Sequence, residues 1–170
     1  YMERLDEAGI DFGICYGTQA LGVLRVGDDE LRPVVYRAMN TMYADMFKGL
    51  ENRLTPTALI PMHKPEEAIA EMEFIKNELG LKAIVMNTQI QRPHPEVVKH
   101  APKLAEYSMA PTSPAIDQGD KYDPVWAKCV ELGLAPTCHN SSRGRGTLNG
   151  SSSNYVYNSL GSFAKGSEYF

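Results

Sequence analysis

The chain has 170 residues, of which 43% are hydrophobic and 22% charged, an ordinary composition for one soluble globular domain. Its 17 basic and 21 acidic residues give a net charge of −4, and neither sign forms a run that would suit nucleic acid or an anionic membrane. No stretch approaches the ~20 apolar residues of a membrane span, and the first residues do not resemble a signal peptide. We therefore expect a cytoplasmic protein with a small-molecule partner.

The three cysteines, Cys15, Cys129 and Cys138, are odd in number, widely spaced and set in apolar contexts. This arrangement argues against a disulfide framework or a C-x-x-C zinc site. We expect buried free thiols.

The first half of the chain alternates helical and strand-like segments. A helical segment at 2–8 ends at Gly9, and a short apolar strand follows at 10–16. Asp28 has the character of an N-cap for a helix that runs to about residue 50. The apolar positions of this helix keep helical spacing and predict its core-facing side: Leu31, Val34, Val35, Ala38, Met42 and Met46.

The next unit begins with an expected strand at 54–62. Pro65, followed by two acidic residues, is typical of a first helical turn, and the helix should end at Gly80. The strand at 81–87 follows directly.

The alternation of helical and strand-like segments is interrupted between residues 88 and 122. Five prolines make this segment a long loop or an insertion, with a helical turn around 97–107. Asp123 and Pro124 then open another helix, which ends at Gly133, and a final apolar strand covers 134–139. A last helix is expected to begin within 154–170.

The four apolar strands do not alternate between polar and apolar residues, which favours parallel strands buried on both faces. We predict an α/β fold of parallel (β/α) units, adjacent in sequence order, that amounts to about half of a (β/α)8 TIM-type barrel. Residues 1–170 would form a single partial barrel domain, an interior piece of a larger protein. The barrel-facing residues Ile14, Ala58, Ile60, Ile84 and Val85 would then be open to water, so we expect a homo-oligomer.

His139 is the strongest candidate for chemistry. It leaves the tip of the last strand and precedes a Ser/Gly-rich stretch, the position from which α/β barrels present metal ligands. The alternative is a hydrogen-bonded histidine at a strand end. Asn87 and Thr88 end the preceding strand and are candidates for substrate contact, and Arg143 is a candidate partner for a substrate carboxylate.

Several phrases of the chain resemble the amidohydrolase-related family, which includes amino-carboxymuconate-semialdehyde decarboxylase and related aromatic-acid decarboxylases. The resemblance covers nearly the whole chain. It is carried by residues 6–11, Arg53-Leu54 leading to Ile60-Pro61-Met62, residues 65–68 and 79–84, and most specifically by Tyr122-Asp123-Pro124-Val125-Trp126 followed by Glu131-Leu132-Gly133 and His139.

This resemblance implies a (β/α)8 barrel with a divalent metal, usually zinc. In the family the ligands are an H-x-H pair on the first strand, a histidine on the fifth strand, which His139 matches, and an aspartate on the eighth. A histidine on the sixth strand commonly acts in catalysis. This sequence contains no H-x-H, and no eighth-strand aspartate is assigned, so the chain holds one ligand of a multi-ligand site.

The resemblance implies a metal-dependent hydrolase or a carbon-carbon decarboxylase, that is a lyase, acting on a small carboxylated substrate. The sequence does not separate these two activities and identifies no catalytic residue. An alternative is a catalytically inactive half-barrel fragment or scaffold that self-associates. A third hypothesis is a metal-independent α/β binding protein.

Overall fold

The computed structural model describes residues 2–115 and 117–139. The chain divides into two compact units, which are described separately. The first comprises residues 1–86 and 124–138, and the second comprises residues 87–123 and those from 139 onward. Within the described residues, no helix is both long enough and apolar enough to span a membrane.

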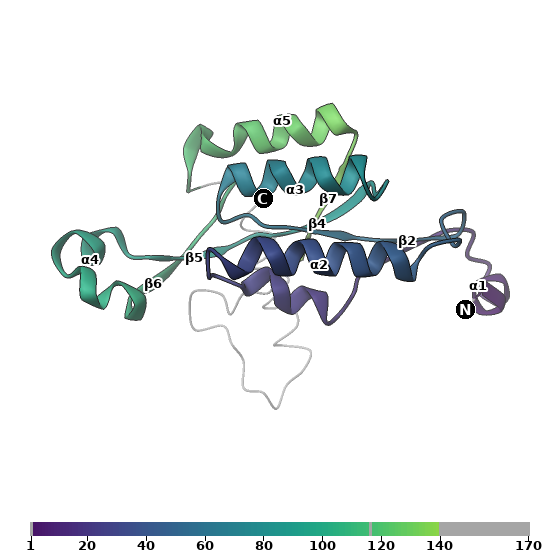
Figure 1. Cartoon of the computed structure of the whole chain (residues 1–170), viewed down its shortest axis with the longest axis horizontal. Coiled ribbons are helices and arrows are strands. Elements are labelled where there is room, and N and C mark those ends of the chain that lie inside the picture. The colour runs from purple at the N-terminus through teal and green to yellow at the C-terminus, as the bar shows by residue number, and fades with distance from the viewer. Residues whose placement is uncertain (1, 116, 140–170) are drawn as a thin grey trace. The chain divides into compact units, whose positions relative to one another are not determined.

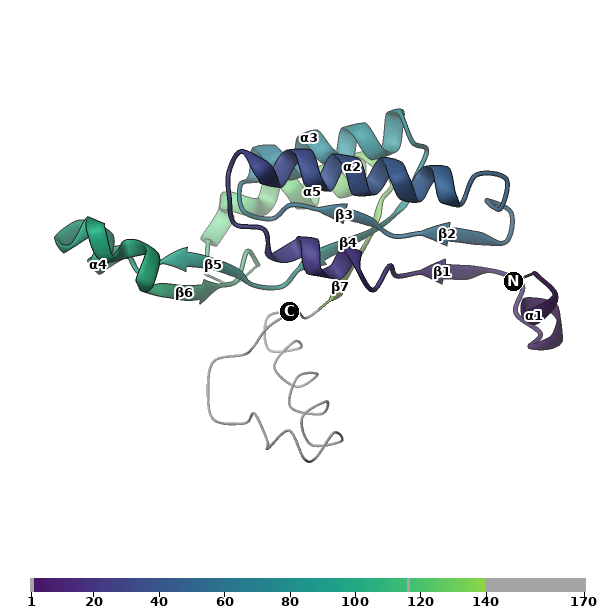
Figure 2. The same ribbon diagram turned by 60° about the horizontal axis from the view of Figure 1, so that its bottom comes forward.

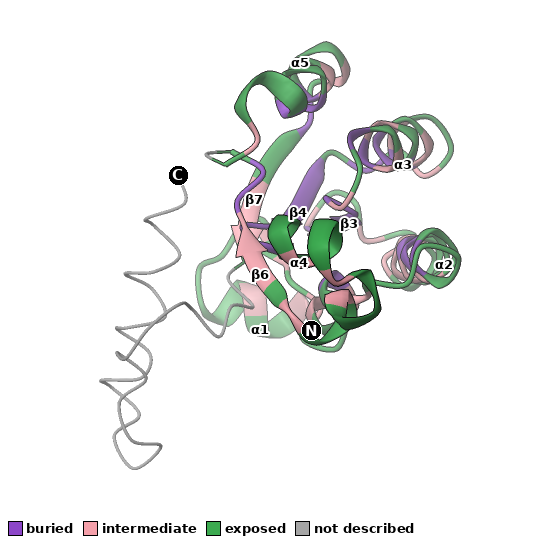
Figure 3. Ribbon diagram, turned by 90° about the vertical axis from the view of Figure 1, so that its left-hand side faces the viewer, coloured by how far each residue is buried: buried purple, intermediate pink, exposed green. Residues whose placement is uncertain are grey.

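The first unit is built from alternating helices and strands. Figures 1 and 3 show its three longer helices, α2, α3 and α5, along one side of the strands. In chain order the elements are α1 (Met2–Glu7), β1 (Gly13–Cys15), the 3-10 helix η1 (Ala20–Arg25), α2 (Leu31–Met46), β2 (Leu54–Pro56), β3 (Ala58–Ile60), α3 (Pro65–Asn77), β4 (Ala83–Asn87), α5 (Asp123–Leu132) and β7 (Ala135–His139).

The helix boundaries follow the local signals in the sequence. Asp28 Oδ1 accepts hydrogen bonds from the backbone N–H groups of Glu30 (3.0 Å) and Leu31 (2.7 Å), as expected of a residue that caps the start of α2. Pro65 occupies the first turn of α3. Gly80 and Gly133 follow α3 and α5 with φ of +69° and +60°, values that glycine adopts without steric cost.

The strands are parallel and lie in sequence order. β1 pairs with β2, and β3 pairs with β4, both in parallel. β7 is the other neighbour of β4. Ala135 N donates to Lys82 O (2.8 Å), and Thr137 Oγ1 donates to Ile84 O (2.7 Å), so contacts advance in the same direction along both segments. The prediction of parallel sheets from sequential (β/α) units is confirmed.

The single strand expected at 54–62 is divided into β2 and β3. At the division, the side chain of Asn40 forms hydrogen bonds with the backbone of β3. Thr57, between the two, still donates its N–H to Cys15 O (2.9 Å) of β1. Beyond it, the Asn40 side chain of α2 accepts from Leu59 N (2.7 Å) and donates to Leu59 O (2.9 Å). The amide also donates to Glu71 Oε1 of α3 (2.8 Å). Asn40 therefore satisfies the backbone of β3 where β1 has ended.

Burial differs between the central and the outer strands. Every residue of β3 and β4 is buried, whereas β1 and β7 consist of half-buried and exposed residues. The prediction that all four strands are buried on both faces is therefore wrong for β1 and β7. Ile14 is 51% exposed, but the other four residues expected to be open to water are fully buried in a single chain: Ala58, Ile60, Ile84 and Val85.

Helix α2 presents the opposite face to the one we predicted. Its buried residues are Arg32, Tyr36 and Asn40. Tyr36 joins an apolar core with Leu24 and Leu59. The predicted core-facing residues are largely exposed, with Leu31 at 53%, Val34 at 65%, Met42 at 42% and Met46 at 62%. Polar contacts to neighbouring elements, not apolar spacing, fix the orientation of this helix.

The second unit contains a β-hairpin where we expected a loop or an insertion. β5 (Ile90–Pro93) pairs in antiparallel fashion with β6 (Met109–Thr112). Two short helices, α4 (Pro95–His100) and the 3-10 helix η2 (Pro102–Tyr107), connect these strands, and Figure 2 shows α4 at the end of the hairpin. These helices confirm the helical turn expected around 97–107. A further 3-10 helix, η3 (Gly119–Tyr122), precedes α5.

Candidate functional site

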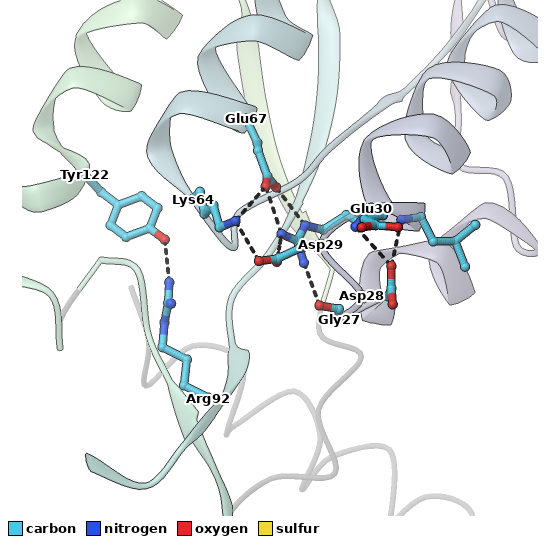
Figure 4. Close-up of polar contacts among 10 residues, drawn as sticks. Gly27, Asp28, Asp29, Glu30, Lys64, Glu67, Arg92 and Tyr122 are labelled. Carbon is cyan, nitrogen blue, oxygen red and sulfur yellow. Dashed lines mark hydrogen bonds and ion pairs between the residues drawn. The ribbon is translucent and has the colours of Figure 1, made fainter. Parts of the chain in front are cut away.

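A network of ion pairs links the starts of α2 and α3 in the first unit (Figure 4). The fully buried Arg32 donates from Nε to Glu67 Oε2 (2.7 Å) and from Nη2 to Glu67 Oε1 (2.9 Å). It also donates from Nη2 to Asp29 Oδ1 (2.6 Å) and from Nη1 to Gly27 O (2.8 Å). Lys64 Nζ lies 2.7 Å from Asp29 Oδ2. Hydrogen bonds from Lys64 and Arg32 lower the pKa of Asp29 to about 2.

This network lies where the chain enters helices after strands β1 and β3, at the carboxyl ends of those strands. Each of the three guanidinium nitrogens of Arg32 already has a partner within the chain. A side chain used in this way holds two helix starts together and is a poor candidate for binding a substrate carboxylate. Sequence reasoning missed Arg32 because it sits among the apolar residues of α2.

The carboxyl end of β4, in the second unit, has the opposite character. Asn87, Thr88 and Gln89 follow one another there and are 8%, 5% and 6% exposed. Thr88 Oγ1, Gln89 Oε1 and Gln89 Nε2 are buried and make no hydrogen bond with any residue that the structure describes. A buried polar group without a partner costs about 1–3 kcal/mol, so such groups are candidates for contact with a ligand or a water.

Polar residues also gather on the adjoining hairpin. Continuing the register of β5 and β6 by one residue sets Gln89 opposite Ser113, which is 1% exposed. Asp117 Oδ2 accepts from Ser113 N (2.7 Å) and fixes the turn that follows. Figure 4 shows Arg92 Nη2 donating to the buried Tyr122 hydroxyl (3.0 Å). The orphaned groups of Thr88 and Gln89 are therefore next to a well-bonded hairpin.

His139 ends β7 and is exposed. Because β7 lies beside β4 and the contacts between them advance in parallel, His139 reaches the same end of the sheet as Asn87. Burial raises the pKa of the neighbouring Cys138 thiol to about 12, so this cysteine is not a thiolate at neutral pH.

The described residues do not by themselves fit a metal ion. Among residues 2–115 and 117–139, no three histidine, cysteine, aspartate or glutamate side chains gather as a metal site would require. His63 is half-buried before α3, and His100 pairs with Glu96 (3.3 Å) on α4. His139 is thus a possible ligand without further ligands in this part of the chain.

The other predicted residues have different outcomes. Asn87 lies beside the orphaned groups, and Arg143 lies outside the described residues. Gln89 was missed because its position, two residues past the predicted strand, carries no motif.

The hydroxyl of Tyr36 is also buried and makes no hydrogen bond with any described residue. The ring packs with Leu24, Leu59 and Val85, and the charges of Arg32 and Glu67 are close enough to act on the hydroxyl. Burial raises the pKa of this phenol, and we regard it as a core residue.

The comparisons with known proteins bear on the fold. No protein-family model matches the chain, and no curated protein matches it. Among solved structures, the dihydroxybenzoic acid decarboxylase from Polaromonas sp. JS666, with bound manganese and the inhibitor 2-nitroresorcinol, has a TM-score of 0.68 and 20% identity over 99% of this chain and 46% of its own. The 2,6-dihydroxybenzoate decarboxylase from Rhizobium has a TM-score of 0.63 and 19% identity, over 93% of this chain and 42% of its own.

A third structure, titled a putative amidohydrolase from Staphylococcus aureus, has a TM-score of 0.67 and 17% identity over 99% of this chain and 50% of its own. The chain therefore spans half the length, or less, of these proteins. The resemblance inferred from the sequence is confirmed at the level of the fold: the chain is similar in structure to decarboxylases and a putative amidohydrolase.

Proposed function

We propose that this chain forms part of a metal-dependent decarboxylase, a carbon-carbon lyase that acts on a small aromatic carboxylate. The observation that carries the proposal is the buried, unpartnered polar segment Thr88–Gln89 at the carboxyl end of β4. Enzymes built from parallel (β/α) units bind substrates at the carboxyl ends of their strands. The similar folds of two decarboxylases of dihydroxybenzoates support this substrate class.

The chemistry of the segment suits a hydroxylated benzoate. The Gln89 amide offers a donor and an acceptor, and the Thr88 hydroxyl offers a rotatable donor. A carboxylate accepts hydrogen bonds only, whereas a phenolic hydroxyl both donates and accepts. One ligand carrying both groups would satisfy all three orphaned atoms, with Asn87 beside them as a further contact.

His139 and Arg143 complete the proposal. His139 would be one of several ligands of a divalent metal, whose other ligands lie outside the described residues. The manganese in the Polaromonas enzyme favours testing manganese beside the zinc that the sequence resemblance implies. Arg143 would pair with the substrate carboxylate.

The proposed architecture is about half of a (β/α)8 barrel within a single partial domain, with residues 88–122 as an insertion that carries the hairpin. The order β1, β2/β3, β4, β7 and the helices on one side of these strands support it. The partly exposed outer strands β1 and β7 support the alternative of an inactive half-barrel scaffold that self-associates.

Binding of 2,6-dihydroxybenzoate, measured by calorimetry with and without Mn²⁺ or Zn²⁺, tests the proposal. We expect weaker binding of benzoate, which lacks hydroxyls, and of resorcinol, which lacks the carboxylate. Gln89→Leu should weaken 2,6-dihydroxybenzoate about 10-fold, the equivalent of one buried hydrogen bond. Gln118→Leu is the matched control, because Gln118 is a half-exposed glutamine just before η3. Equal binding of all three ligands would contradict the proposal.

The reaction itself separates the two enzyme classes. Release of CO₂ from 2,6-dihydroxybenzoate in the presence of metal would identify a decarboxylase. Hydrolysis of amide or ester substrates without CO₂ release would identify a hydrolase, the class to which the similar protein from Staphylococcus aureus is assigned. Binding without either reaction would favour the inactive scaffold.

A further inference from the structure

Helix α2 exposes an apolar surface that the other described residues leave uncovered. At ~100° per residue, an arc of about 120° that also contains Val35 and Asp45 holds its exposed apolar positions Leu31, Val34, Ala38, Met42 and Met46. Four of these five side chains are large and 42–65% exposed. A contiguous apolar stripe on a surface helix marks an interaction site, unlike an isolated exposed apolar residue such as Val130 of α5.

The orientation of α2 is fixed by its opposite face. Arg32 binds Glu67, and Asn40 binds Leu59 and Glu71, so rotating the helix to bury the stripe would break all of these contacts. The stripe therefore stays at the surface of the described residues, where a partner can reach it.

The arrangement of the stripe matches a second copy of itself. The smallest residue, Ala38, lies at the middle of the 16-residue helix, and the large residues lie toward both ends. If two copies of α2 pack antiparallel about a twofold axis at Ala38, Leu31 of one copy faces Asp45 and the adjoining Met46 of the other. Val34 and Val35 then face Met42. A small central residue allows two helix axes to approach to about 8–10 Å.

Charges at the ends of α2 fit the same arrangement. Glu30 immediately precedes the helix and Lys48 follows it by two residues, and both are exposed. Antiparallel packing brings Glu30 of each copy toward Lys48 of the other, whereas parallel packing would bring like charges together. A twofold contact forms this pair twice.

We propose that the exposed α2 stripe is the contact surface of a homodimer, in which two α2 helices pack antiparallel about a twofold axis at Ala38. Methionine at two of the facing positions, Met42 and Met46, lets such a surface adapt its packing. One helix pair is a small interface, so we expect a dissociation constant on the order of micromolar. This proposal does not depend on the catalytic function.

Sedimentation velocity of the 170-residue chain over a concentration series tests the dimer. We expect a monomer–dimer equilibrium in the wild type, weakened at least about 10-fold by Val34→Glu, because the new carboxylate would lose its hydration in the contact. Val130→Glu is the matched control, an exposed valine on another helix, and should leave the equilibrium unchanged. Far-UV circular dichroism checks that both variants are folded.

Cross-linking tests the geometry. In Ala38→Cys, oxidation should produce a disulfide between the two copies of residue 38, identified by peptide mapping, whereas Val130→Cys should not cross-link to itself. A wild type that stays monomeric at all concentrations would overturn the proposal. So would equal dimerisation of Val34→Glu and wild type, which would move the contact to another surface, such as the exposed side of β1.

Discussion

Two clusters of polar residues, one around Arg32 and one at Thr88 and Gln89, lie at the carboxyl ends of strands. They differ in how many of their polar atoms have a hydrogen-bond partner. Around Arg32, every guanidinium nitrogen has a partner, and the neighbouring acids and Lys64 pair with one another. At Thr88 and Gln89, three buried polar atoms have no partner among the described residues. The first arrangement stabilises the fold, and the second lowers stability unless something binds.

The difference gives a criterion for finding sites. Charge and burial alone would have favoured Arg32, which is fully buried and pairs with two acidic residues. Counting unsatisfied donors and acceptors favours Thr88 and Gln89 instead. Substitutions that remove polar groups should therefore affect stability in opposite directions in the two places.

The largest effect is expected at Arg32. Arg32→Met should lower the free energy of unfolding by about 3 kcal/mol, because Glu67 and Asp29 would be left without the buried cation between them. Arg32→Lys keeps the charge but loses the two-pronged contact with Glu67, and should cost less. Urea unfolding followed by circular dichroism measures both. A stability within about 0.5 kcal/mol of wild type for Arg32→Met would contradict the structural role.

Asn40 should show the next largest effect. Asn40→Ala removes three hydrogen bonds and leaves the N–H and C=O of Leu59 unsatisfied inside the protein, so we expect a loss of about 2 kcal/mol. Thr41→Ala, one residue away on the exposed side of α2, is the control and should be close to neutral. If both substitutions cost the same, helix propensity and not the contact with β3 would be responsible.

At the end of β4, substitutions that remove polar groups should raise the free energy of unfolding instead of lowering it. Thr88→Val and Gln89→Leu remove buried polar atoms that have no partner, so each should raise the free energy of unfolding, by about 1 kcal/mol, in the absence of ligand. The same variants should gain less stability than wild type when 2,6-dihydroxybenzoate is added. Thermal unfolding with and without ligand measures both effects. Destabilisation of the ligand-free variants would mean that these side chains already have partners.

The smallest effect concerns pH. The pKa of Asp29 is lowered to about 2 by Lys64 and Arg32, below the ordinary value of about 3.9. Its contribution is therefore present above pH ~4 and is lost as the pH falls toward 2. The difference in stability between wild type and Asp29→Asn should be greatest near neutral pH and should vanish near pH 2. A difference that is independent of pH would contradict this coupling.

The sequence predicted the order and direction of the helices and strands better than it predicted which face of each helix is buried. Gly80, Gly133 and Pro65 placed helix ends correctly, because backbone conformation at glycine and proline depends on the residue itself. The exposed face of α2 was predicted wrongly from apolar spacing. Which face is buried depended on Asn40 and Arg32 meeting partners 19 and 35 residues away, which periodicity does not reveal.

The site was predicted only in part. Asn87 and Thr88 were proposed for substrate contact because they end a strand, and this role remains a prediction. Gln89 was not proposed, because its lack of a partner is a property of the folded chain. The hairpin of β5 and β6 was also missed, since Pro93 and Pro111 argue against strands in isolation. The role of His139 remains a prediction, because a metal site requires several ligands and the described residues bring only one to this end of the sheet.

The contact between Asn40 and Leu59 has a consequence for exchange of the backbone amides. Most strand amides in a parallel sheet are protected by a neighbouring strand, and exchange when the sheet opens. The amide of Leu59 is held by a side chain of α2, so its exchange with deuterium reports the detachment of that helix alone. Leu59 is therefore a built-in probe of whether α2 leaves the sheet before the strands separate.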